Sequence, residues 1–100
     1  MVIGFLTRDD YAARRGRLLV WEPAGFSTRP YTAALTDDLG LLFVADANDI
    51  DRLRREGLAE LPLLLRQRRC DQYILKTMEA LEAAGLGEFI ENLGLNFPIH

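Results

Sequence analysis

Five consecutive apolar residues, Leu41–Ala45, constrain the fold of this chain more than any other feature. An uninterrupted run of this kind is typical of a strand buried on both faces, because a half-exposed strand alternates apolar and polar residues. The chain has 100 residues, which is enough for one small domain with one core. We therefore expect residues 1–100 to form a single domain, with a central strand over 41–46.

Two further strands are expected in the N-terminal half. The apolar segment 2–7 predicts the first, and the segment 17–22 predicts the second, which Pro23 would end. Between them, Thr7 is a candidate N-cap for a short helix that would end before Gly16. A long hairpin loop over 8–15 is the alternative.

Helical patterns dominate the C-terminal half. Asn48 is a candidate N-cap for a helix over 49–56, which Gly57 would end. An apolar stripe then predicts one helix over 62–84, which could break near Arg69–Asp71. A last short helix is expected over 87–93. The sequence thus predicts an α+β fold, in which a small antiparallel or mixed sheet from the N-terminal half is covered by C-terminal helices.

Scarce residues exclude several kinds of chemistry. Cys70 and His100 are the only cysteine and histidine, so the chain has neither an internal disulfide nor the ligands of a Cys/His zinc site. A terminal histidine is poorly placed for a catalytic triad. We expect no catalytic residues, no metal site and no cofactor. No apolar run is long enough for a membrane span, and the N-terminal residues do not resemble a signal peptide, so we expect a cytoplasmic protein.

The basic residues are almost all arginine, with Lys76 the single lysine. They gather in three clusters: Arg14, Arg15 and Arg17; Arg52, Arg54 and Arg55; and Arg66, Arg68 and Arg69. The simplest interpretation is surface ion pairing, with the partners Asp49, Asp51, Glu56 and Glu60. Guanidinium groups also bind carboxylates and phosphates, so the clusters could hold an acidic protein or a nucleic acid. The net charge of −3 argues against a nucleic acid.

Charge is divided unevenly along the chain. Residues 1–36 carry a net charge of +2, whereas residues 70–100 carry −4. A polarised surface of this kind favours docking on another macromolecule.

The segment 24–32 is the least regular part of the sequence and combines Phe26, Arg29 and Tyr31. Exposed aromatic and arginine side chains are enriched at binding hot spots, although packing of this segment on the sheet is the plainer interpretation. We predict a partner-binding surface that combines three residues of this segment with the first arginine cluster. Its residues are Phe26, Arg29, Tyr31, Arg14, Arg15 and Arg17.

The sequence names no function, and we favour a small intracellular protein-interaction module. Such a module would bind, and could inhibit or neutralise, a partner protein, as accessory, immunity and inhibitor proteins of bacteria and phages do. Self-association as a homodimer through the helix 62–84 is a related expectation.

Two alternatives stay open. The chain could be a nucleic-acid-binding regulator that uses Arg52, Arg55, Arg66 and Arg69. It could also be a metal-dependent enzyme that uses Asp46 with Asp10 or Asp49, because acids after a buried strand can hold Mg²⁺.

Overall fold

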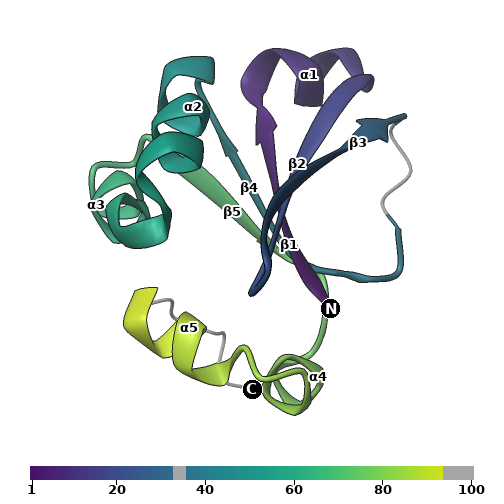
Figure 1. Cartoon of the computed structure of the whole chain (residues 1–100), viewed down its shortest axis with the longest axis vertical. Coiled ribbons are helices and arrows are strands. Elements are labelled where there is room, and N and C mark those ends of the chain that lie inside the picture. The colour runs from purple at the N-terminus through teal and green to yellow at the C-terminus, as the bar shows by residue number, and fades with distance from the viewer. Residues whose placement is uncertain (33–35, 94–100) are drawn as a thin grey trace.

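The predicted buried strand is β4 (Leu39–Ala45), in which every residue is buried. The computed structural model describes residues 1–32 and 36–93 (Figure 1). In it, β4 lies between β1 (Val2–Thr7) and β5 (Cys70–Ile74), inside a sheet of order β3-β2-β1-β4-β5. An interior strand that is covered on both faces explains the uninterrupted apolar run.

The sheet is mixed, as expected. β1 and β4 are parallel, with Phe5 opposite Phe43, whereas β4 and β5 are antiparallel. β2 (Gly16–Glu22) is antiparallel to both β1 and β3 (Gly25–Tyr31). The α+β prediction is therefore confirmed, and four of the five strands come from the N-terminal half.

Apolar side chains form a cluster on each face of the sheet. One cluster joins Phe5, Phe43 and Leu41 to residues of the helices that lie along the left and lower sides of Figure 1. Those helical residues are Ile50, Leu53, Leu61, Leu64, Leu81 and Ile90. The described members of the other cluster come from the strands, apart from Leu75, which follows β5.

The prediction of one helix over 62–84 is wrong. The segment divides into α3 (Leu61–Arg66), β5 and α4 (Met78–Ala83). Arg68 adopts a left-handed conformation, with φ of 58°, which ends the helical path. β5 then pairs with the outer edge of β4, whose buried backbone N–H and C=O groups need hydrogen-bond partners. A homodimer through a helix over 62–84 therefore has no structural basis.

The irregular segment 24–32 is also more ordered than expected. Gly25–Tyr31 pairs with β2 over seven positions, from Glu22 opposite Gly25 to Gly16 opposite Tyr31. Pro30 fits because β3 is an edge strand, where a missing N–H is tolerated.

Residues 8–15 form a short helix rather than a hairpin loop. α1 (Arg8–Ala13) is capped by Thr7, whose side-chain oxygen accepts a hydrogen bond from the Asp10 N–H at 3.1 Å. Arg14 ends this helix in a left-handed conformation with φ of 58°. Gly16 follows with φ of 138°, a conformation that only glycine adopts readily.

The remaining helices follow the sequence closely. α2 (Ala47–Glu56) begins two residues earlier than expected, with Asp46 rather than Asn48 at the N-cap position, and ends at Gly57 as predicted. The 3₁₀ helix η1 (Leu58–Glu60) leads into α3, and α5 (Gly87–Leu93) has the predicted bounds. Within residues 1–32 and 36–93, no helix is long and apolar enough to cross a membrane.

We expect Gly16→Ala to destabilise the protein by about 1–3 kcal/mol, because φ of 138° strains any other residue. An added Cβ would also lie 2.5 Å or less from the Asp10 carboxylate. Urea unfolding followed by Trp21 fluorescence measures the change. Gly87→Ala is the control, because an added Cβ there meets chiefly the Glu82 side chain at 3.3 Å. Equal stability of the Gly16→Ala variant and the wild type would contradict this account.

Candidate interaction site

A hollow of about 250 Å³ opens where β2 begins and β3 ends. Its lining consists of Gly16, Arg17, Thr28, Arg29 and Pro30. In Figure 1 this end of the hairpin lies at the top right, beside α1. The hollow brings together two of the predicted partner-binding residues, Arg17 and Arg29, and we call it the basic hollow.

The turn between α1 and β2 positions the first of these arginines. The Asp10 carboxylate accepts a hydrogen bond from the backbone N–H of Arg17 at 3.2 Å. That bond holds the start of β2 against α1, while the side chains of Arg14, Arg15 and Arg17 stay exposed. Among the described residues, none of these three arginines forms an ion pair.

Arg29 is held by an acidic neighbour. Its guanidinium contacts both carboxylate oxygens of Asp38, at 2.8 Å and 3.0 Å. The Thr36 hydroxyl also donates to Asp38. These hydrogen bonds lower the pKa of Asp38 from 3.8 to about 2, with the bond from Arg29 the largest cause. Asp38 therefore fixes Arg29 in place, and the unpaired arginines supply the positive charge of this region.

The two aromatic residues predicted at this surface are not freely exposed. Tyr31 is buried, with 6% of its surface exposed, and belongs to the cluster on the face opposite α2. Phe26 is partly buried and packs against Phe5, with ring centroids 6.3 Å apart. Both side chains support the sheet, which is the plainer interpretation of the segment.

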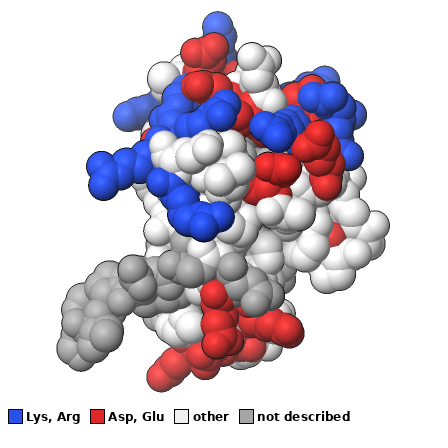
Figure 2. All heavy atoms as spheres, turned by 90° about the vertical axis from the view of Figure 1, so that its left-hand side faces the viewer, with Lys and Arg blue, Asp and Glu red and all other residues white. Residues whose placement is uncertain are grey.

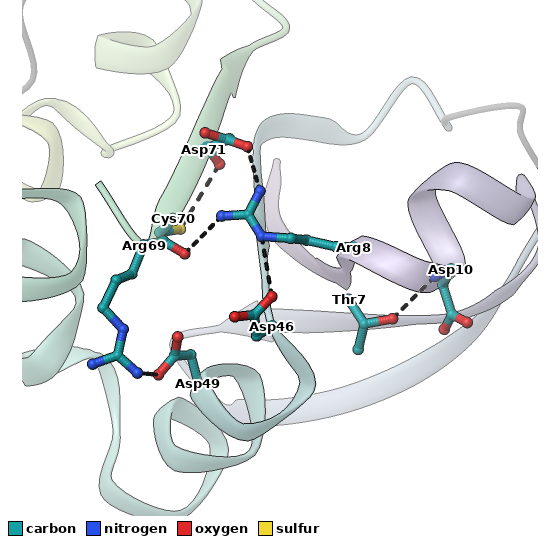
Figure 3. Close-up of polar contacts among 8 residues, drawn as sticks. All are labelled: Thr7, Arg8, Asp10, Asp46, Asp49, Arg69, Cys70 and Asp71. Carbon is teal, nitrogen blue, oxygen red and sulfur yellow. Dashed lines mark hydrogen bonds and ion pairs between the residues drawn. The ribbon is translucent and has the colours of Figure 1, made fainter. Parts of the chain in front are cut away.

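A second polar cluster lies at the carboxyl ends of the parallel strands β1 and β4. Arg8, the residue after β1, contacts Asp46 at 3.2 Å and Asp71 at 2.7 Å (Figure 3). It also donates to the backbone carbonyl of Arg69 at 3.0 Å. The hydrogen bond to Asp71 is the largest cause of a raised pKa of Arg8, and the negative charges of Asp71 and Asp46 add to it. One guanidinium thus ties together the ends of β1 and β4 and the start of β5.

A buried carboxylate lies beside this cluster. The Asp49 side chain is 3% exposed and pairs with Arg69 at 2.6 Å, as Figure 3 shows. Its second oxygen is buried without a hydrogen-bond partner among the described residues. Because an unpaired buried charge is costly, Arg69 is needed to hold Asp49 in the first turn of α2.

Each residue of the metal-enzyme alternative is engaged in a contact of its own. Asp46 contacts Arg8, Asp49 contacts Arg69, and Asp10 bonds the N–H of Arg17. Over the ranges 1–32 and 36–93, no group of three or more histidine, cysteine or acidic side chains could hold a metal ion.

Three of the six arginines in the second and third clusters form ion pairs with other described residues. Arg52 contacts Glu56 and Glu60, and Arg55 contacts Asp51. Together with the pair Arg69–Asp49, these contacts confirm the ion-pair interpretation for Arg52, Arg55 and Arg69, whereas Arg54, Arg66 and Arg68 form no ion pair with another described residue. Among the arginines of the nucleic-acid alternative, only Arg66 has no ion pair within the described part of the chain.

Sequence reasoning missed Arg8 and the contact between Tyr11 and Tyr73. The exposed rings of Tyr11 and Tyr73 stack with centroids 5.4 Å apart, and this contact joins α1 to β5. Cys70 is buried on β5, and burial raises the pKa of its thiol to about 12. The only sequence feature that could have drawn attention to Arg8 is its position directly after a buried strand. No pattern of neighbouring residues predicts the contact between Tyr11 and Tyr73.

Comparison with known proteins bears on the fold alone. No protein-family profile matches the chain, and no curated protein sequence matches it significantly. A stereoselective inverting sec-alkylsulfatase from Pseudomonas sp. is similar in structure, with a TM-score of 0.50 and 16% identity. A double mutant of a sec-alkyl sulfatase gives a TM-score of 0.48 at 16% identity. Each alignment covers 100% of this chain but only 13% of the sulfatase chain.

The lowered pKa of Asp38 makes the free energy of unfolding depend on pH in the acid range. Because the folded pKa of about 2 lies below the ordinary 3.8, Asp38 stabilises the fold fully above pH 3.8. That contribution is lost as the pH falls from 3.8 towards 2. NMR titration of the carboxyl carbon should give a midpoint near 2 in the wild type, and Arg29→Met should raise it towards 3.8. A wild-type midpoint at the ordinary value would contradict the ion pair.

Removal of Arg69 should destabilise the protein through Asp49. We expect Arg69→Met to cost about 1–3 kcal/mol, less than for a fully buried pair because the arginine side chain is 50% exposed. Thermal unfolding near neutral pH measures the loss. Arg66→Met is the matched control, since Arg66 is exposed and forms no ion pair within the described residues. Equal melting temperatures for the two variants would contradict the role given to Arg69.

Proposed function

We propose that this chain is a protein-interaction module that binds an acidic segment of a partner protein at the basic hollow. The observation that carries the proposal is a hollow of about 250 Å³ lined by Arg17, whose exposed side chain forms no ion pair with another described residue. Arg14 and Arg15 are exposed on the turn that precedes it. Guanidinium groups bind carboxylates through paired hydrogen bonds, so this surface suits aspartate and glutamate side chains.

The size of the hollow favours a side chain over a free small molecule. Pockets for drug-sized ligands and cofactors usually measure ~300–1,000 Å³, whereas this hollow measures about 250 Å³. β3 forms its outer wall at the edge of the sheet. An extended segment of a partner could lie along this edge and place one carboxylate against Arg17, since Asp38 already holds the Arg29 guanidinium.

Contacts elsewhere also support binding over the two alternatives. Phosphate binding at Arg52, Arg55 and Arg69 would compete with their contacts to acidic side chains. A metal ion at Asp46 would compete with Arg8 in the same way. We therefore propose a binding role without catalysis, of the kind that inhibitor and immunity proteins perform. A single buried cysteine suits an intracellular, cytoplasmic setting.

The Arg17→Ala variant tests the proposal. A fluorescein-labelled peptide of alternating Glu and Ser should bind the wild type in low salt, as measured by fluorescence anisotropy. Loss of one charge-assisted contact should weaken binding about tenfold, which corresponds to about 1.4 kcal/mol. The backbone N–H of Arg17 keeps its bond to Asp10 in this variant, so the turn should survive.

The control variant is Arg54→Ala, which removes the same charge from the exposed side of α2. It should bind the acidic peptide as the wild type does. A Lys–Ser peptide of equal length should not bind. The proposal fails if the acidic peptide does not bind the wild type. It also fails if Arg17→Ala and Arg54→Ala weaken the binding of that peptide equally. Tighter, steeply salt-dependent binding of a DNA duplex would favour the nucleic-acid alternative instead.

A further inference from the structure

The last two described helices form a surface of one charge. α4 and α5 carry Glu79, Glu82, Glu88 and Glu91, all exposed. None of these side chains forms an ion pair with another described residue. The span 78–93 contains no lysine or arginine. Figure 2 shows acidic side chains without basic neighbours at the lower end of the molecule, and we call this the acidic surface.

The acidic surface and the basic hollow lie at opposite ends of the molecule. In Figure 1 the longest axis is vertical, with α4 and α5 at the bottom. The start of β2 and the end of β3, which line the basic hollow, lie at the top beside α1. The molecule measures 33 Å along its longest axis. The uneven charge along the sequence is therefore a separation of charge in space.

We propose that the acidic surface of one copy of this chain docks into the basic hollow of a second copy. The proposal rests on the function proposed for the basic hollow and names the partner as a second copy. Four exposed carboxylates without described partners on α4 and α5 complement the exposed Arg14, Arg15 and Arg17. Since the two patches lie at opposite ends, one contact leaves a free patch on each copy. Association is then head-to-tail, as in heterologous assemblies, rather than two-fold.

The overall charge of −3 does not prevent this contact. The Debye length is about 8 Å at physiological ionic strength, so a contacting surface feels mainly its nearest charges rather than the sum over the molecule. Exposed ion pairs are individually weak and are screened by salt. The assembly should consequently be weak, dependent on concentration and reversed by added salt.

Sedimentation velocity on the full chain tests the assembly. The mean mass of the wild type should rise with protein concentration in low salt and return to that of the monomer in high salt. The paired substitution Glu82→Gln with Glu88→Gln should weaken self-association at least tenfold, and so should Arg17→Ala. Glu56→Gln removes an exposed carboxylate from α2 and serves as the control, which should associate as the wild type does. Circular dichroism confirms that each variant is folded.

Mixing the two weakened variants gives the sharpest test. The glutamine variant keeps its basic hollow and the Arg17→Ala variant keeps its acidic surface, so their mixture should form a one-to-one heterodimer and nothing larger. Monomeric wild type at every concentration in low salt, or a mixture that stays monomeric while both variants are folded, overturns the proposal.

The glutamine variant also separates this proposal from the function on which it rests. If that variant binds the Glu–Ser peptide while the wild type does not self-associate, the second copy is the wrong partner and the basic hollow remains a docking site. If neither binding nor association occurs, both proposals fail.

Discussion

The parallel pairing of β1 with β4 is the contact on which the other elements depend. Both strands are almost entirely buried, and Phe5 stacks on Phe43 with ring centroids 5.4 Å apart. Parallel strands cannot be joined by a tight turn, so the chain between them needs a long connection. Here that connection contains α1 and the hairpin of β2 and β3. The basic hollow lies on this hairpin and is therefore a product of the route that the chain takes between its two buried strands.

The same pairing explains the cluster around Arg8. Parallel strands end at the same edge of a sheet, which brings Arg8 and Asp46 together although 37 residues separate them in sequence. The antiparallel β5 begins at that edge and adds Asp71. One guanidinium then meets two carboxylates. This arrangement stabilises the three strand ends and occupies the acids that could otherwise attract a metal ion.

Local patterns predicted the parts of the fold that short-range chemistry determines. The apolar run of β4, the Thr7 cap and the glycine that ends α2 could all be recognised within a few residues. The segment around β5 could not, because the apolar spacing of residues 62–84 suits a helix. Pairing with the open edge of β4 overrides that preference, and this edge belongs to a distant part of the chain. The basic hollow was predictable only as residue types, because its lining depends on the pairing of β2 with β3, which sets Arg17 opposite Pro30 and Arg29 opposite Leu18.

Pro30 has a consequence for how this protein can assemble. It occupies the edge strand β3, which would otherwise offer a continuous row of backbone donors and acceptors to any extended chain. With a proline in that row, a sheet cannot extend indefinitely from one molecule to the next at this edge. Contacts there have to rely on side-chain charge. Complexes formed at this end of the molecule should therefore dissociate when salt is added or the protein is diluted. Growth of this edge into insoluble cross-β fibres is disfavoured.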